Sequence, residues 1–590
     1  PAYAISHDLN PLYSTAMFHP SGVNLLSNTA ELGLGVVLAP VTWIFGPIAT
    51  LNVSLTLSPL LSSLAMFVLV RRWVRWQPAA FVAGLLYGFS PFILIGLTDA
   101  HLMLSMAPIP PLVVLCLDEL LLRQHRPPAR TGVVLGLLVT AQFFIGSEVL
   151  VLTIIAAAIG IAFVALYGLW HIEELMRRVR HALVALGTAV VTAGVLLAYP
   201  VWFALAGPAH LSGPVWGPDS PISYGGTNGK DYLLPAVPSA TTTALGHRLG
   251  GYQAPTLSGQ YLGIGLLAVL AIGCVLWRRD RRLWLFGAVG AVSVPLSFGL
   301  HLRSWTVWRL FVRFPLMDNV IPSRFLLITY LCAAVMLGVI VDHTYRAVAR
   351  WNAAPPDERR PRMPGVALRG AGAIAALAVA VIALLPIAGY YSSGVPLAAR
   401  PVILPAWFRA EAPRLHGHQV ILVFPVPFSL TQSAMTWQAV DGMSYSMVGG
   451  GGPNALITRA GPEAPGQAYL ANLSIAGGPQ AVVPEEVSAV RKALDGWGAT
   501  MVVIPDPTNL PIYERLHLVR TTAVLITAAT GRPPVRQHGA WVWTRLDHAG
   551  PAVAASSDRL ALCGAGPAGG SVVSIQRSTA CVVATPATDR

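Results

Sequence analysis

The feature that most constrains this sequence is a series of long apolar runs separated by short polar segments. A helix that crosses roughly 30 Å of hydrocarbon needs about 20 mostly apolar residues. The chain is 54% hydrophobic and only 11% charged, far from the average of soluble domains. We predict that ten runs span a membrane as helices: residues 53–70, 79–95, 108–122, 133–145, 149–169, 183–205, 261–277, 283–300, 325–341 and 371–387.

The arginines lie between these runs and predict their orientation. Nineteen of them fall in five segments, residues 71–75, 123–130, 177–180, 278–282 and 346–369. Basic residues collect in cytoplasmic loops of membrane proteins, so we expect all five segments on the cytoplasmic side. Membrane orientation therefore accounts for the net charge of +13, and we do not expect nucleic-acid binding.

Counting spans from segment 71–75 predicts which loops lie outside. They are residues 97–106, 146–148, 208–259, 301–324 and everything after residue 390. Because ten is an even number of spans, we expect both ends of the chain on the outside of the cell membrane. Because the sequence opens at Pro1 within an apparent outside loop, we expect a first transmembrane helix upstream of it.

We expect three regions along the chain. Residues 1–50 form a first outside loop whose amphipathic segment, 31–45, lies along the membrane surface. Residues 51–390 form the helical bundle. In residues 391–590, strand-like runs at 419–424, 499–504 and 540–544 and a helical pattern at 484–494 predict an extracytoplasmic α/β domain.

The tail of this domain, from residue 549, is rich in Ala, Gly, Ser and Val, and we expect terminal strands there. Cys563 and Cys581 are the two cysteines outside the predicted spans. An oxidising compartment would permit a disulfide between them, and the sequence leaves that pairing open.

Ionisable groups at the outside ends of spans are costly to keep there and are therefore the first candidates for a site. Asp99 and His101 lie two residues apart, where they could help hold a divalent cation such as Mg²⁺ or Mn²⁺; alternatively, they cap the helix end. Glu148 lies in a tight break between two spans, with Gln142 before it. Glu148 is either a site residue or a solvated loop carboxylate.

Four arginines depart from the charge pattern by lying on the outside, Arg303, Arg309, Arg313 and Arg324. We expect an anion to compensate them. Arg324, in the sequence Pro-Ser-Arg-Phe, stands at the mouth of a span, where a guanidinium can grip a phosphate at two points. The alternative is that these side chains extend to lipid head groups.

Motifs for other chemistries are absent from the sequence. It contains no Walker A pattern, no Cys-x-x-Cys pair and no His-Glu-x-x-His. Lys230 and Asp231, in the outside loop 208–259, are weaker candidates whose alternative is a solvated turn.

The first loop contains four short motifs, Leu-Asn-Pro-Leu-Tyr at 9–13, His-Pro-Ser-Gly-Val-Asn-Leu-Leu-Ser-Asn at 19–28, Ala-Pro at 39–40 and Phe-Gly-Pro at 45–47. Together with Arg324 in its tetrapeptide, they resemble a bacterial branch of the GT-C superfamily of membrane glycosyltransferases. It covers roughly residues 1–345. The arginine-rich, lysine-poor composition suggests an actinobacterial member.

The resemblance implies an inverting transfer of a sugar from a polyprenyl-phosphate donor to a cell-envelope glycan or lipid acceptor. In this branch the general base is a carboxylate close after the first span, hence upstream of Pro1. Asp8 precedes Glu31 in the loop, and we do not expect it to be the base. Arg324 and Arg313 would bind the donor phosphate, helped by a cation at Asp99 and His101.

Two other functions fit the same sequence. One is a lipid or polysaccharide transporter, although transporters commonly show paired halves and no such repeat is visible here. The other is a non-catalytic membrane protein that binds a glycan or scaffolds an envelope complex.

Overall fold

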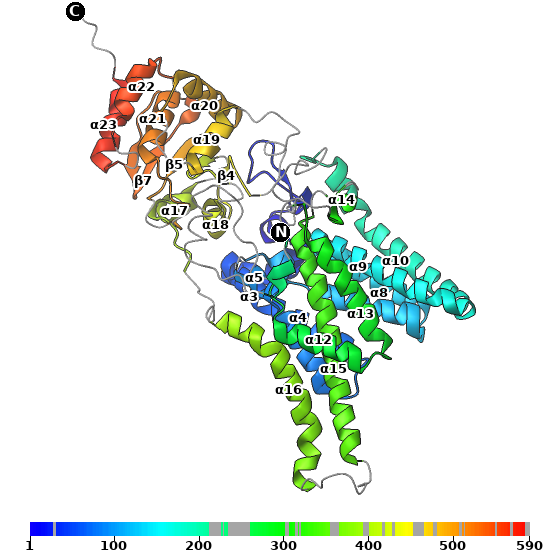
Figure 1. Cartoon of the computed structure of the whole chain (residues 1–590). Helices are drawn as coiled ribbons and strands as arrows, with labels where there is room; N and C mark the ends of the chain where they lie inside the picture. The colour runs from blue at the N-terminus through cyan, green and yellow to red at the C-terminus, as the bar shows by residue number, and fades with distance from the viewer. Residues whose placement is uncertain are drawn as a thin grey trace, which may run out of the picture.

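The computed structural model describes most of the chain. The described residues are 1–27, 31–98, 100–211, 226–227, 229–233, 260–300, 306–312, 317, 320–353, 365–392, 401–415, 419–427, 431–451, 465–475, 481–506, 510–511, 514–548, 551–566 and 570–584. A helical bundle lies at one end of the molecule and an α/β domain at the other (Figure 1).

The first loop begins with short elements: α1 (Ala2–Ser6), β1 (Tyr13–Ser14), β2 (Val23–Asn24), η1 (Leu25–Ser27) and α2 (Leu32–Val37). Strands β1 and β2 pair as an antiparallel hairpin. The bundle follows with α3 (Ala39–Val70), α4 (Gln77–Gly88), α5 (Pro91–Thr98), α6 (Leu102–Ser105), α7 (Ile109–Leu117), the π-helical η2 (Asp118–Arg123), α8 (Pro128–Ile145), α9 (Ser147–Gly168), η3 (Leu169–His171), α10 (Ile172–Ala206), η5 (Gly229–Tyr232), α12 (Ile264–Leu276), α13 (Arg281–Ser297), α14 (Trp308–Phe311), η8 (Pro322–Phe325), α15 (Leu326–Ala353) and α16 (Gly365–Ser392).

All ten predicted spans fall on helices, but the predicted number of spans is not confirmed. Within the described residues, seven helices are long and apolar enough to cross a membrane, or up to eight if the bent pair α4 and α5 is one span. With 13 and 17 residues, α12 and α13 are short for that length. Pro91, which lacks an N–H group, opens α5 at a bend of 43° from α4.

A kink divides α3 near its N-terminal end. Gly46 has a φ of +84°, a conformation that favours glycine, and Pro47 follows it. The residues before the kink include Trp43, Ile44 and Phe45, which are 53%, 71% and 70% exposed. Together with α2, this short apolar segment covers the region for which we predict a surface helix.

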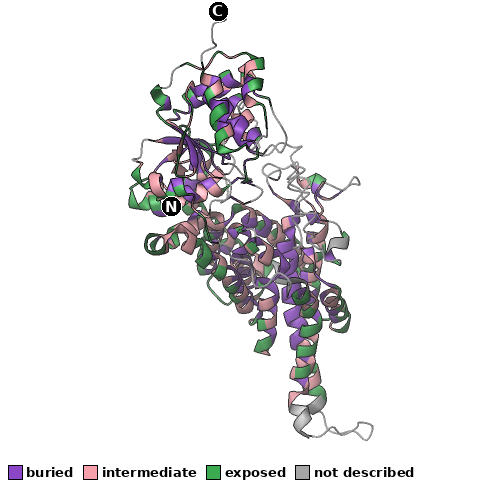
Figure 2. Cartoon of the chain, turned by 90° about the vertical axis from the view of Figure 1, so that its left-hand side faces the viewer, coloured by how far each residue is buried: buried purple, intermediate pink, exposed green. Residues whose placement is uncertain are grey.

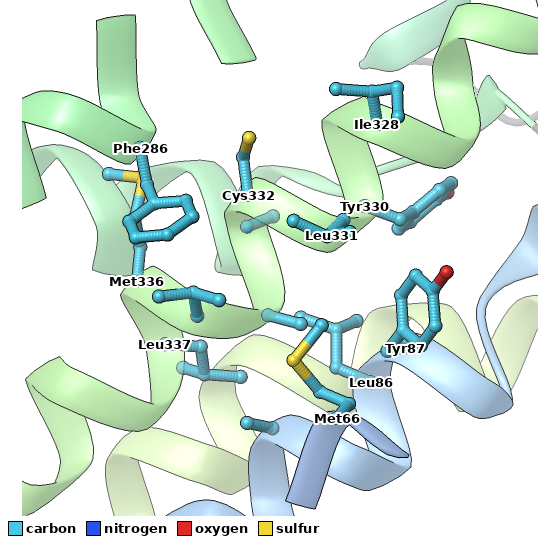
Figure 3. Close-up of a cluster of buried hydrophobic side chains, with 14 of the residues drawn as sticks. Met66, Leu86, Tyr87, Phe286, Ile328, Tyr330, Leu331, Cys332, Met336 and Leu337 are labelled. Carbon is cyan, nitrogen blue, oxygen red and sulfur yellow. The ribbon is translucent and has the colours of Figure 1, made fainter. Parts of the chain in front are cut away.

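Helix α15 is the centre of the bundle. It packs against α4, α13 and α16, and its apolar window is completely buried. Figure 3 shows its side chains, among them Tyr330 and Leu337, meeting Met66 of α3, Tyr87 of α4 and Phe286 of α13. Figure 2 shows the same division, with buried residues inside the bundle and exposed ones around it.

The outer surface of the bundle is apolar. Val190 and Val195 on α10, Val275 on α12 and Leu385 on α16 are 63 to 72% exposed. Apolar surface costs about 25 cal/mol per Å² in water, so a continuous belt of such residues belongs in lipid. The chain is a multi-pass membrane protein.

The described parts of the five basic segments lie on the side of the bundle away from the α/β domain (Figure 1). Side chain to backbone contacts connect neighbouring segments: Arg123 to Arg72, Gln124 to Arg178, Arg282 to Trp73, and Asp342 to the N–H groups of Arg75 and Trp76. Buried carboxylates compensate the charge, with Asp118 pairing with Arg123 and Asp342 with Arg346. The side of the membrane on which these segments lie stays a prediction from the arginine pattern.

The C-terminal domain has three layers. A mixed sheet runs in the order β4-β3-β5-β7-β6, parallel from β4 to β5 and antiparallel from β5 to β6. Alternate strand residues face opposite sides, so Leu422 and Val502 pack on one helical layer and Ile421 and Val503 on the other. The domain consists of α17 (Ala406–Glu411), η9 (Ala412–Arg414), β3 (Val420–Val423), α18 (Ser433–Val440), β4 (Ser446–Met447), α19 (Pro465–Ile475), α20 (Pro484–Gly496), β5 (Met501–Ile504), α21 (Val519–Thr530), β6 (Val535–Gln537), β7 (Ala540–Trp543), η12 (Leu546–His548), α22 (Ser557–Gly564) and α23 (Val572–Val583).

Three predicted strands and one predicted helix of this domain are present as β3, β5, β7 and α20. The expectation of terminal strands is wrong, because the described part of the tail forms α22 and α23. The side chains of Ser556 and Ser571 accept backbone N–H bonds at the two N-termini, a favourable start for a helix. A disulfide joins Cys563 and Cys581, one on each helix.

Candidate functional site

Glu148 is positioned by a close contact at the start of α9. A side chain on Gly146 would place its Cβ 2.9 Å from the carbonyl oxygen of Met103, so glycine lets the two segments approach. Glu148 then lies in the first turn of α9, where the helix dipole favours a negative charge. The break between the two spans therefore presents a carboxylate at a fixed place.

Glu148 and Arg324 form an ion pair between residues 176 positions apart in the sequence. Carboxylate Oε2 meets Nη1 of Arg324, and Oε1 accepts the N–H of Ile321 at 2.8 Å. The side chains of Arg324 and Glu148 are only 14% and 11% exposed. Glu148 is thus not a solvated loop carboxylate, and it supplies the anion that we expect beside Arg324.

Pro322 helps to fix this arginine at the mouth of α15. Ile321 is extended, as residues before proline usually are. Pro322 begins the single turn η8, which carries Arg324 and continues directly into α15. The guanidinium is therefore placed at the end of the most buried helix of the bundle.

Glu31 is a third charged residue at this end, and the sequence analysis did not select it. Its Oε1 accepts the N–H of Met103 at 3.2 Å. Burial raises the pKa of Glu31 from 4.5 to about 7, against the opposing effect of that hydrogen bond. A sequence signal was available, since Asp8 and Glu31 are the only carboxylates among the first 98 residues.

Met103 contacts both Glu31 and the segment that precedes Glu148. Its N–H binds Glu31, and its carbonyl lies against Gly146, two residues before Glu148. Gln142 is completely buried and donates from Nε2 to the carbonyl of Gly146 at 3.1 Å. Its Oε1 is buried with no hydrogen-bond partner among the described residues, an uncommon state that leaves an acceptor available.

Of the other predicted site residues, some are exposed and some lie outside the described residues. Asp99, Arg303 and Arg313 are outside them, as are the side chains of Lys230 and Asp231 in η5. His101 is exposed at the start of α6, and Arg309 is exposed on α14. Asp8 is exposed. Among the described residues, no three His, Cys, Asp or Glu side chains are gathered to hold a metal ion.

No protein-family model and no curated protein sequence matches the chain. Among solved structures, the Archaeoglobus fulgidus oligosaccharyltransferase tethered to an acceptor peptide is 13% identical with a TM-score of 0.43, covering 85% of this chain and 63% of that one. The arabinofuranosyltransferase AftD from Mycobacteria is 14% identical with a TM-score of 0.45, covering 92% of this chain and 37% of that one. The same archaeal enzyme, AglB, in complex with an inhibitory peptide and a dolichol-phosphate, is 12% identical with a TM-score of 0.38, covering 85% and 64%.

The chain thus spans less than two thirds of the length of each of these proteins. Identities and TM-scores this low leave activity and substrate to be argued from the residues of this chain itself.

Proposed function

We propose that this protein is an inverting membrane glycosyltransferase of the GT-C type. It would move a sugar from a polyprenyl-phosphate donor to a cell-envelope glycan or lipid acceptor on the extracytoplasmic face of the plasma membrane. The observation that carries the proposal is the Arg324–Glu148 pair, a shielded cation at the end of α15 opposite the basic loops. The motifs shared with GT-C enzymes support it.

Arg324 suits the phosphate of such a donor. A guanidinium carries five N–H donors in a fixed plane, and the ion pair with Glu148 engages Nη1. The lipid tail of a donor would lie among the apolar helices, which brings its phosphate to the depth of the span mouth. In a site shielded from water, an arginine stabilises the charge that develops on a leaving phosphate more strongly than it would in bulk solvent.

The resemblance implies a general base upstream of Pro1; among the described carboxylates of this chain, Glu31 is the one that we propose for that role. A base works best when its pKa lies near the working pH, and burial raises the pKa of Glu31 to about 7. In the proposed step, Glu31 takes the proton of the acceptor hydroxyl as its oxygen attacks the anomeric carbon. The bond from that carbon to the phosphate oxygen breaks, and the electron pair leaves with the polyprenyl phosphate beside Arg324. Attack from the opposite side inverts the anomeric centre.

Glu148 and Gln142 would shape the site around these two residues. Glu148 holds Arg324 and the backbone of Ile321 at once, so it keeps the guanidinium oriented before the donor arrives. The free Oε1 of Gln142 could accept a hydrogen bond from a sugar hydroxyl if a substrate opens the site.

A divalent cation has weaker support. Mg²⁺ prefers six oxygen ligands, and His101 is the one member of the predicted pair that the structure describes. The described residues gather no set of three suitable side chains. No step of the proposed mechanism therefore passes through a metal ion.

Turnover with defined donors tests this function. Purified protein would be incubated with a panel of polyprenyl-phosphate sugars and envelope-glycan acceptors, and released polyprenyl phosphate would be measured by mass spectrometry. We expect release with wild type, loss with Glu31→Gln, and retention with Asp8→Asn, a matched change at an exposed first-loop carboxylate. If purified protein in vesicles moves labelled lipid across the vesicle membrane without releasing polyprenyl phosphate, the result would instead support the transporter alternative.

A further inference from the structure

The tip of the β1–β2 hairpin completes the edge of the C-terminal sheet. Strand β4 is at that edge, and edge strands offer unpaired backbone groups. Met447 of β4 donates its N–H to the carbonyl of Ala16 at 2.8 Å and accepts the N–H of His19 at 3.0 Å. Phe18 donates to the carbonyl of Gly449 at 3.2 Å. The hairpin therefore binds the domain through main-chain hydrogen bonds, as an added strand would.

Side chains reinforce this contact. Phe18 is only 2% exposed, and a Cβ on Gly450 would lie 2.7 Å from its ring. Gln438 of α18 donates from Nε2 to the carbonyls of Ala16 and Tyr445, both at 2.8 Å. The three atoms nearest to a Cβ at position 450 thus all belong to the first loop.

The other end of the hairpin is fixed to the bundle beside Glu31. Asn24 is fully buried and donates to the carbonyls of Phe203 at 2.9 Å and Pro208 at 3.2 Å. Leu12 packs with Leu32 and Phe203 in one buried cluster. Leu32 follows Glu31 directly, so the hairpin connects the C-terminal sheet to the neighbourhood of the candidate base.

We propose that the C-terminal domain positions Glu31 through this hairpin, with Gln438 and Gly450 as positioning residues. The connection assigns the domain a role inside the catalytic unit, besides any role in binding an acceptor. The catalytic part of this inference rests on the proposed function, whereas the mechanical connection can be measured without any substrate.

Hydrogen exchange in the full-length protein tests the connection. Gly450→Leu inserts a side chain against Phe18, and the matched control is Gly496→Leu, at the end of α20, where a Cβ meets nothing within 4 Å. We expect amides of residues 12–27 to exchange at least about tenfold faster in Gly450→Leu because that segment opens locally. Strands β3 and β5 should keep their protection, and the control should match wild type. Unchanged exchange in residues 12–27 would overturn the proposal.

A double-cysteine variant tests the same contact through a covalent cross-link. The Cβ of Met17 lies 3.0 Å from the Cβ position of Gly450, and disulfides need about 3.5 to 4.5 Å, so a shift of a few tenths of an ångström suffices. We expect Met17→Cys with Gly450→Cys to cross-link on oxidation and to retain the protection of residues 12–27. Met17→Cys with Gly496→Cys should not cross-link. Failure of the first pair to cross-link would contradict the docking.

The pH profile of turnover tests the positioning of Glu31. Burial raises the pKa of Glu31, so a loosened hairpin that admits water should lower that pKa toward 4.5. In Gly450→Leu we therefore expect kcat to fall and the acidic limb of kcat/KM to move to lower pH. If Gly450 had only a structural role, Gly450→Leu would reduce the amount of active protein without moving the acidic limb of kcat/KM. Absence of turnover in wild type would overturn the proposed function, and hydrogen exchange would still decide the connection.

Discussion

Replacing Glu31 with glutamine should make the protein more stable above neutral pH while removing its turnover. Burial raises the pKa of Glu31 from 4.5 to about 7. Between these two values the folded protein keeps a proton that the unfolded chain has released, so the free energy of unfolding falls as pH rises. Glutamine stays neutral and can still accept the N–H of Met103, so Glu31→Gln removes this loss of stability at high pH.

The magnitude follows from the size of the pKa shift. At about 1.36 kcal/mol per pKa unit, ionised Glu31 costs about 3 kcal/mol above pH 7 and below 1 kcal/mol at pH 5. The difference in stability between Glu31→Gln and wild type should therefore grow by about 2 to 3 kcal/mol between pH 5 and pH 8. Turnover of wild type should show an acidic limb near pH 7, because the base must be ionised.

Thermal unfolding in one detergent, at a fixed scan rate, measures this effect from pH 5 to pH 8. Asp8→Asn is the control, because Asp8 is an exposed carboxylate in the same loop and its replacement should leave the profile unchanged. The reasoning is refuted if the melting temperatures of wild type and Glu31→Gln keep a constant difference across this pH range.

Three further outcomes are expected. Glu148→Gln should lower stability by about 3 kcal/mol because it leaves the buried charge of Arg324 unpaired, and adding Arg324→Gln should restore most of it; additive losses in a thermal double-mutant cycle would argue against the pair. Cys563→Ser should destabilise the C-terminal domain by about 3 kcal/mol, from the loop that the disulfide closes, and a reducing agent should then have no further effect on its melting. Gly136→Leu should prevent α8 from packing against α10, because its Cβ would lie 2.7 Å from the carbonyl oxygen of Ala189. Gly194→Leu, where a Cβ meets open space, is the control. Equal size-exclusion profiles of the two variants would contradict this expectation.

Much of the bundle could be predicted because lipid imposes simple rules. A span must be long and apolar, so its helix can be predicted from the local sequence. The orientation that the arginines indicate stays a prediction. The lengths of α12 and α13 were less predictable, because an apolar run does not fix where a helix begins. The prediction of strands in the tail was wrong for a related reason. Alanine, serine and valine occur in strands and helices alike, and helix caps such as Ser556 and Ser571 favour helices here.

The candidate site was predictable only in part. The positions of Glu148 and Arg324 at span ends marked both residues, but no local pattern reveals that they meet across 176 positions. Glu31 was missed because its contact with Met103 of α6 joins residues 72 positions apart in the sequence. Ion pairs and raised pKa values arise from such long-range contacts. The spacing of residues in a single sequence does not show which distant residues meet in the fold.

In the proposed function, Arg324 binds the phosphate of a lipid-linked donor. Binding of polyprenyl phosphate, without a sugar, would be measured by native mass spectrometry for wild type, Arg324→Ala, Arg324→Lys and the exposed control Arg309→Ala in nanodiscs. Loss of charge-assisted hydrogen bonds should weaken binding to Arg324→Ala on the order of 10- to 100-fold, with Arg324→Lys between and Arg309→Ala close to wild type. Equal affinity of wild type and Arg324→Ala would contradict the account.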